Sequence, residues 1–333
     1  ALLMKRNIVI GPPGTGKTTF LKNKVDTLIT SGHCRADEIG YFSFTVKAAE
    51  EIRDRVTKEE WSEAELKKLF PYFCTLHSLA YKRLQLQQSQ IMDQSDYDDL
   101  SRDTGRFFVN KMKKGNGMDI SMPTAKSEYQ DLINLAYAKF PDNEDRLNQV
   151  FRTVKLSDYG ARNTIEQMDV DLKNFKRDRD KLEYVDYFNH FLKRKNPPPL
   201  KYLFVDEAQD LSAHQWQVIN MIQEVAKPIE TYVAGDDDQA IFRWAGADIE
   251  HFIAMANNDA NTIIPLTQSY RIPRSVHTLA TNLAQSISRR IEKSYKPRDE
   301  EGERKVLNIR PLNKGLAEGE WLILCRTHEI VQQ

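Results

Sequence analysis

The chain has 333 residues, 40% hydrophobic and 29% charged, which supports globular cores and suggests about two domains. Its 48 basic and 48 acidic side chains balance to zero net charge, so any nucleic-acid site must be a local patch. No apolar run approaches the roughly 20 residues of a membrane helix, and the three scattered cysteines lack metal-ligand spacing. We therefore expect a cytoplasmic protein without a membrane segment.

The first elements are an apolar strand pattern at 6–10, a glycine-rich turn and a helical pattern at 20–29. The turn reads Gly11-Pro12-Pro13-Gly14-Thr15-Gly16-Lys17-Thr18-Thr19, a Walker A phosphate loop in its required strand-turn-helix context. Backbone N–H groups at such a helix start cradle phosphates, Lys17 reaches the β- and γ-phosphates, and the Thr18 hydroxyl ligates Mg²⁺. The segment predicts binding of a nucleoside triphosphate, against the alternative of a turn that holds no ligand.

Strand and helix patterns continue to alternate as far as residue 86. Strands are expected at 39–45 and 72–76, and helices at 46–56 and 78–86. Such alternation is typical of a parallel α/β sheet.

From about 87 to 180 the character changes, because charged residues dominate and β-branched runs disappear. Helical patterns at 97–112, 127–140 and 166–177 are separated by Gly and Pro breaks. We interpret this stretch as a helical insertion.

The buried-strand pattern resumes at 200–206, and two further strands are expected at 230–234 and 262–266. Helices at 213–225 and 249–257 lie between them.

Past Pro265 a new unit is expected. It has a helix at 275–295 and strands near 306–309 and 321–325.

Two adjacent acids, Asp206 and Glu207, end the strand at 200–206. A phosphate-loop enzyme needs a carboxylate for Mg²⁺ and a base that orients the attacking water, and these acids fit those two roles in order. The alternative is a pair of solvated acids in a turn.

The run Asp206-Glu207-Ala208-Gln209-Asp210 resembles motif II of superfamily 1 DNA helicases of the UvrD/Rep group. Further segments are similar to this group's motifs in the same order. They are motif Ia at 44–53, motif Ib at 75–78, an acidic-aromatic box at 183–188, motif III at 233–247, motif IV at 268–271 and a strand of the second motor domain at 324–327.

The resemblance implies an α/β fold, a RecA-like P-loop NTPase domain at 1–86 and 181–265 with a helical accessory domain inserted at 87–180. A partial second RecA-like domain would follow at 266–333. It also implies an ATP-dependent DNA helicase or translocase that hydrolyses ATP with Mg²⁺ and moves 3′ to 5′ on single-stranded DNA.

The resemblance also implies roles at the nucleotide. Gln239 would sense the γ-phosphate or the attacking water, Arg271 would be an arginine finger, and Tyr270 would stack on adenine. With these, the expected catalytic groups are Lys17, Asp206, Glu207, Gln239 and Arg271, and the expected Mg²⁺ ligands are Thr18 and Asp206.

The implied DNA contacts come from three of the motifs. Aromatic rings suit a moving strand because every base has a π-face. The alternatives are rings that face a core and a structural histidine among these residues, and a surface ion pair for Arg271 at the nucleotide. The contacts are Phe44, Thr45, Thr75, His77, Phe242, Arg243 and Trp244.

Two departures from the group's pattern stand out: Ala245 occupies a position where the group usually has arginine, and nothing in the chain resembles motifs V and VI. Two alternatives therefore stay open, a nucleotide-gated single-stranded DNA-binding module without unwinding activity and a P-loop ATPase that does not act on DNA. The expected partners are single-stranded DNA or a single/double-strand junction, with other repair or replication proteins, for a monomer in the cytoplasm of a bacterial or phage-infected cell.

Overall fold

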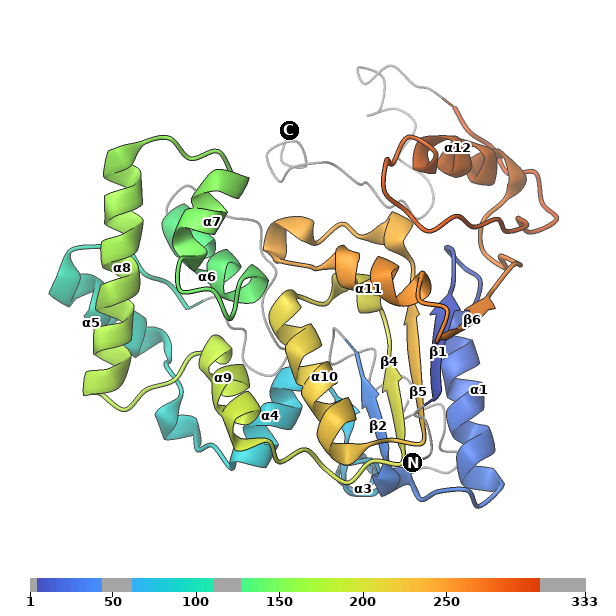
Figure 1. The fold of residues 1–333 in the computed structure, drawn as a ribbon, viewed down its shortest axis with the longest axis horizontal. Coiled ribbons are helices and arrows are strands. Elements are labelled where there is room, and N and C mark those ends of the chain that lie inside the picture. The colour runs from blue at the N-terminus through green and yellow to red at the C-terminus, as the bar shows by residue number, and fades with distance from the viewer. Residues whose placement is uncertain (1–4, 44–61, 111–126, 306–333) are drawn as a thin grey trace, which may run out of the picture.

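The computed structural model describes residues 5–43, 62–110 and 127–305, with a parallel sheet at its centre (Figure 1). Within these residues the strands follow the order β3-β2-β4-β5-β1-β6, and all neighbours are parallel. The strands are β1 (Lys5–Ile10), β2 (Ile39–Phe42), β3 (Phe73–Cys74), β4 (Tyr202–Val205), β5 (Glu230–Gly235) and β6 (Thr262–Pro265). The predicted α/β fold class, with a RecA-like parallel sheet, is confirmed.

The inner strands are buried on both faces, which explains their unbroken apolar sequences. Successive side chains of a strand point to opposite faces, so Ile8 and Ile10 belong to one core and Val9 to the other. In the same way Leu203 and Phe204 of β4 lie in different cores and are both fully buried. The edge strand β6 is mostly exposed.

Helices cover both faces of the sheet (Figure 1). On one face, Leu21 and Val25 of α1 pack with Val9 and Phe204. On the other, Leu79, Phe191 and Trp216 of three different helices belong to the larger core. The helices in the sheet-containing part of the chain are α1 (Lys17–Thr30), α3 (Glu63–Leu69), α4 (Leu76–Leu84), α9 (Tyr184–Arg194), α10 (Ala213–Ala226) and α11 (Ile249–Ala256), with short 3₁₀ turns η1 (Ala36–Glu38), η3 (Ala208–Asp210), η4 (Asp237–Gln239) and η5 (Arg243–Ala245).

The described residues between α4 and α9, which are 85–110 and 127–183, form a separate helical body, at the left of Figure 1. Its own core contains Leu100, Phe151, Ile165 and Leu172, none of which belongs to the cores of the sheet. Its elements are η2 (Gln88–Gln90), α5 (Gln94–Thr104), α6 (Glu128–Lys139), α7 (Arg146–Thr153) and α8 (Tyr159–Asp178).

Two predicted helices of this body differ from the observed ones in their ends. The helix expected at 166–177 begins earlier, at Tyr159, because the side chain of Asp158 caps it by accepting from the Ala161 N–H at 3.2 Å. The helix expected at 97–112 ends at Thr104, because Gly105 adopts a left-handed conformation with φ 67°.

The helix predicted at 275–295 is wrong in length, since α12 spans only Arg274–Ala284. Beyond it the chain pairs with the segment that follows β6, where the Lys296 N–H donates to Thr267 O and the Ser269 N–H donates to Lys296 O, both at 2.8 Å. These long-range contacts outweigh the local helical pattern. The helix expected at 46–56 and the strands expected near 306–309 and 321–325 lie outside the described residues.

Candidate nucleotide site

The loops that follow β1, β4 and β5 meet at one edge of the sheet, because parallel strands end on the same side. The loop after β1 is pinned to the end of β5, where the Gly11 N–H donates to Gly235 O at 3.1 Å. The Walker A loop and motifs II and III therefore share one edge.

The Walker A loop is held in shape by its own side chains. Thr15 donates its hydroxyl to Pro12 O at 2.7 Å, and the Lys17 ammonium donates to Gly11 O at 2.9 Å. A β-carbon on Gly11 would come within 2.0 Å of Cγ of Lys17, so the lysine stem fills the space that only glycine leaves. Gly16, directly before α1, has φ 82°, a left-handed conformation that also favours glycine.

Asp206 lies 1% exposed at the end of β4 and contacts the Walker A helix. Its Oδ2 accepts from the hydroxyl of Thr18 at 3.2 Å and from the phenol of Tyr41 at 2.7 Å. Burial raises the pKa of this carboxyl and the charge of Glu207 raises it further, against the opposing hydrogen bonds. Tyr41, in β2, was not predicted, since its place in an apolar strand gave no sign of a polar role.

Glu207, two residues after the end of β4, has a left-handed backbone conformation with φ 51°. Its Oε2 lies 4.0 Å from Nζ of Lys17 and accepts from Nε2 of Gln209 at 2.8 Å. Lys17 thus lies between the Walker A backbone and the second acid of motif II. The predicted residues Lys17, Thr18, Asp206 and Glu207 are brought together.

Gln239 of motif III lies three residues after the buried Asp236, to which its amide donates at 2.5 Å. The backbone N–H of Asp236 in turn donates to Oε1 of Gln209 in motif II at 3.0 Å. Motifs II and III are thereby joined through a buried amide that sequence reasoning left without a role.

A buried cluster of opposite charges secures the start of motif III. The Lys293 side chain is 6% exposed, and its Nζ lies 2.9 Å from Asp236, 3.1 Å from Asp238 and against Asp237. Burial alone lowers the pKa of Lys293, but the charge of Asp236 and the hydrogen bonds of the cluster outweigh it and raise the pKa. Arg290 adds a bidentate contact to Asp238 at 2.8 and 2.6 Å. Both bases follow α12, in the stretch that was expected to be helical.

The motif IV segment lies directly on the Walker A loop. Ser269 donates its hydroxyl to Pro13 O at 2.8 Å, and the Tyr270 N–H donates to Gly14 O at 2.9 Å. A β-carbon on Gly14 would come within 2.4 Å of Cβ of Arg271. Tyr270 is 75% exposed, and Arg271 is exposed beside it.

The residues expected to contact DNA have mixed surroundings. Thr75 follows β3 and caps α4, accepting from the Ser78 N–H at 3.2 Å. The half-buried His77 ring lies 4.1 Å from the Phe188 ring and 4.5 Å from the Tyr184 ring, measured between centroids. Burial, with the charge of His214, lowers the pKa of His77 to about 3, so its ring is neutral at pH 7.

The motif III loop continues past Gln239 into η5. Phe242 is half-buried, and the exposed guanidinium of Arg243 lies 3.6 Å from Glu250. Phe44, Thr45 and the side chain of Trp244 lie outside the described part of the structure. The DNA-contact roles stay predictions.

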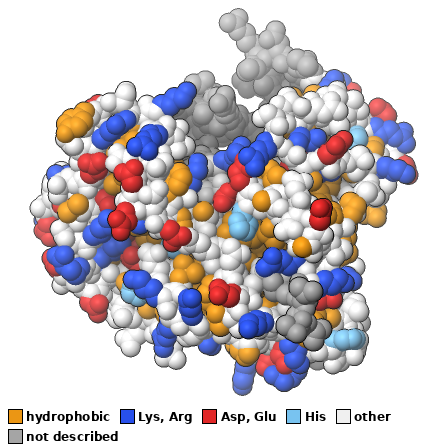
Figure 2. Space-filling view, viewed as in Figure 1, with side chains coloured by type: hydrophobic (Ala, Val, Ile, Leu, Met, Phe, Trp, Pro, Cys, Tyr) orange, Lys and Arg blue, Asp and Glu red, His pale blue; other side chains and the backbone are white. Residues whose placement is uncertain are grey.

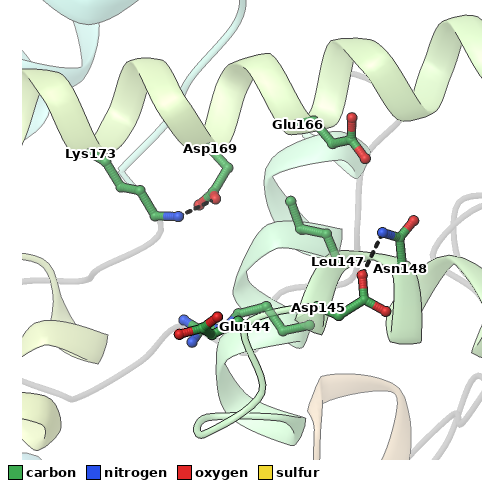
Figure 3. A pocket seen from close by; sticks show the side chains of 8 residues that line it. Glu144, Asp145, Leu147, Asn148, Glu166, Asp169 and Lys173 are labelled. Carbon is green, nitrogen blue, oxygen red and sulfur yellow. Dashed lines mark hydrogen bonds and ion pairs between the residues drawn. The ribbon is translucent and has the colours of Figure 1, made fainter.

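A separate hollow of about 330 Å³ lies on the helical body, among α7 and α8 (Figure 3). Two pairs of its lining side chains contact each other, Lys173 with Asp169 at 2.6 Å and Asn148 with Asp145 at 2.6 Å. Figure 2 shows acidic and basic side chains interspersed over the visible face. Across the described ranges, no helix is long and apolar enough to cross a bilayer.

Similar proteins agree with the motifs. The chain is 28% identical over 302 residues to a protein named "Probable DNA helicase" from Mycoplasma pneumoniae, covering 86% of this chain and 54% of that protein. It is 24% identical to "ATP-dependent DNA helicase PcrA" of Staphylococcus aureus, over 89% of this chain and 40% of that protein, and 24% identical to "DNA helicase II" of Haemophilus influenzae, over 89% and 41%. The chain thus spans about half the length of these relatives or less.

The match to a protein-family model covers most of the chain. Residues 1–260 match the UvrD/REP helicase N-terminal domain, so the matched part includes the Walker A loop, the helical body and motifs II and III. This chain belongs to the UvrD/REP helicase family, by its N-terminal domain.

Proposed function

We propose that the chain is the nucleotide-binding motor part of an ATP-dependent DNA helicase or translocase. One observation carries the proposal: Thr18 and Lys17 of the Walker A loop contact Asp206 and Glu207 of motif II, at 3.2 and 4.0 Å. The four groups that phosphoryl transfer needs from these two motifs are therefore adjacent. The relatives named as DNA helicases support DNA as the polymer on which the motor acts.

Mg²⁺ and the ATP phosphates would bind where these groups meet. The Thr18 hydroxyl and the Asp206 carboxylate are hard oxygen donors, which is the ligand class that Mg²⁺ takes, so the donor set fits the ion. When bound, Mg²⁺ would neutralise negative charge on the phosphates. The Walker A backbone would hold the β- and γ-phosphates, Lys17 would exchange its contact with Gly11 O for phosphate oxygens, and the exposed Tyr270 would stack on adenine.

Hydrolysis requires an oriented water molecule and donors for the γ-phosphate. Glu207 would hold and deprotonate the water, because its carboxylate faces Lys17 at the phosphate end of the loop. Gln239 and Arg271 would stabilise the transferring phosphoryl group from motifs III and IV.

On the DNA side, Phe242 and Trp244 would stack on bases and Arg243 would meet a phosphate, with Phe44, Thr45, Thr75 and His77 as further contacts. We expect 3′ to 5′ movement on single-stranded DNA or at a single/double-strand junction, by a monomer in the cytoplasm, with other repair or replication proteins as partners. The division into a motor domain at 1–86 and 181–265, an accessory domain at 87–180 and a second motor domain from 266 belongs to this proposal.

ATP hydrolysis by the full-length protein, measured with and without a single-stranded oligonucleotide, tests the proposal. We expect the oligonucleotide to raise the rate, and Lys17→Ala to abolish hydrolysis in both conditions. A rate that does not respond to DNA would favour a P-loop ATPase of another kind. ATP-sensitive oligonucleotide binding without hydrolysis would favour a nucleotide-gated binding module.

A further inference from the structure

Gln209 of motif II lies in η3, within hydrogen-bond distance of the start of motif III, and is 2% exposed. Its amide is used on both sides. Nε2 donates to Oε2 of Glu207 at 2.8 Å and approaches Oδ2 of Asp210 at 3.4 Å, while Oε1 accepts from the Asp236 N–H at 3.0 Å. A buried amide with partners at both ends has one orientation, because only its nitrogen donates and only its oxygen accepts.

On the donor side, Gln209 fixes the acid expected to act as base. The Glu207 side chain is 39% exposed, and its contact with Lys17 is at the long distance of 4.0 Å. The shorter hydrogen bond from Gln209 therefore sets the direction of this carboxylate.

On the acceptor side, the Gln209 side-chain oxygen is hydrogen-bonded to the backbone of motif III. A β-carbon on Gly235 would come within 2.9 Å of Oε1 of Gln209, so the glycine leaves the room that the amide needs. Asp236, which donates its N–H to Gln209, uses its carboxylate for Nε2 of Gln239 at 2.5 Å and Nζ of Lys293 at 2.9 Å. A displacement of this backbone therefore moves the partner of the Gln209 oxygen.

We propose that Gln209 is a positioning residue that couples the direction of the Glu207 carboxylate to the position of motif III. The inference rests on the proposed function, in which the loop that follows Gln239 binds a DNA strand. When DNA shifts this loop, the Asp236 N–H moves, the Gln209 amide follows it, and the Glu207 carboxylate is aligned for its water. A misalignment of about 1 Å at such a group is enough to cost roughly a hundredfold in rate.

Two substitutions separate this role from simple packing. Gln209→Glu keeps the shape and an oxygen that accepts from Asp236, but replaces the donor to Glu207 with a second acid. Gln209→Met removes both hydrogen bonds and keeps the volume. Gln223→Met is the matched control, because Gln223 is also a buried glutamine, 4% exposed, whose side chain accepts from Nε of Arg6 at 3.0 Å. Gln223 lies near the C-terminal end of α10, away from motif II.

Steady-state ATP hydrolysis, without and with saturating single-stranded oligonucleotide, is the measurement, together with the melting temperature of each variant. We expect both Gln209 variants to lower kcat by about tenfold or more and to leave the KM for ATP within about threefold. In the two Gln209 variants the ratio of the rates with and without DNA falls toward one. Gln223→Met changes neither kcat nor this ratio.

A kcat for both Gln209 variants equal to that of the unsubstituted protein overturns the inference. So does a loss explained by the fraction unfolded, as judged from the melting temperatures. Failure of the proposed function is recognised by a different result: the unsubstituted protein itself then shows no DNA-stimulated hydrolysis. That result removes the proposed function and, with it, the role of Gln209.

Discussion

The hydroxyl of Ser269 donates to the carbonyl oxygen of Pro13 at 2.8 Å, across 256 residues of sequence. Ser269 is fully buried and also accepts from the Ile272 N–H at 3.1 Å. It therefore ties the segment after β6 to the Walker A loop. The loop's shape depends on a residue beyond the sheet.

Ser269→Ala should weaken ATP binding more than it slows chemistry. Losing a buried hydrogen bond costs about 1–3 kcal/mol, and here the loss falls on the loop that cradles phosphates. We expect the KM for ATP to rise by about three- to tenfold, with kcat changed by less than about twofold.

The control is Ser286→Ala, which removes an exposed hydroxyl that donates to Leu283 O at 2.7 Å. Steady-state kinetics of both variants check the expectation. An unchanged KM in Ser269→Ala would mean that the Walker A loop keeps its shape without this bond.

Asp210→Asn should stabilise the protein increasingly as the pH rises. Burial, followed by the charge of Glu207, raises the pKa of Asp210 from 3.8 to about 7. Between those values the native state holds a proton that the unfolded chain has lost, so this contribution favours the native state at low pH and is lost as the pH rises through 7. Asparagine keeps the acceptor for Gln209 and never ionises.

Melting temperatures of the variant and the unsubstituted protein at pH 5, 6, 7 and 8 are the measurement. The melting temperature of Asp210→Asn should exceed that of the unsubstituted protein by an amount that grows from pH 5 to pH 7 and then levels off. Asp178→Asn, an exposed carboxyl with a 63% exposed side chain, is the control. A gap independent of pH would contradict the raised pKa.

His77→Phe tests a pH dependence of the opposite sign. Burial, followed by the charge of His214, lowers the pKa of His77 from 6.5 to about 3. The unfolded chain therefore binds a proton that the native state excludes, so this stability is present above pH 6.5 and is lost as the pH falls toward 3. Phenylalanine preserves the contact with the Phe188 ring and removes the titration.

Urea unfolding at pH 7 and pH 5 should show a smaller loss of stability in His77→Phe than in the unsubstituted protein. His190→Phe, at an exposed position of α9, is the control. Equal losses in the two proteins would show that His77 is not shielded from protonation. Oligonucleotide affinity of the same variant at pH 7 tests the predicted DNA contact.

The sequence was sufficient for residues whose local context carries their chemistry. Lys17 and Asp206 follow apolar strands in recognisable motifs, and parallel strands bring such positions to one edge. Tyr41 and Lys293 could not be predicted in this way. The first lies in an apolar strand, and the second lies in a helical pattern that long-range ion pairs to Asp236 override.

Lys293→Met should destabilise the protein strongly, because it removes the cation from a cluster of buried acids. The side chains of Asp236 and Asp237 are 0% and 1% exposed beside Lys293. Leaving a buried charge without its partner typically costs about 3–5 kcal/mol. Adding Asp237→Asn to Lys293→Met should restore part of this loss, since it removes one of the uncompensated charges.

The free energy of unfolding, measured in urea, distinguishes this buried cluster from an ordinary surface pair. Lys201→Met is the matched control, because Nζ of Lys201 lies 3.0 Å from Glu38 but its side chain is 47% exposed. Solvent screens such a pair, so we expect the control to lose no more than about 1 kcal/mol. If Lys293→Met loses no more than Lys201→Met, water reaches the three aspartates and the cluster does not hold motif III. If the double variant recovers stability, the acids themselves are the source of the cost, and Lys293 is what permits three consecutive aspartates at the end of β5.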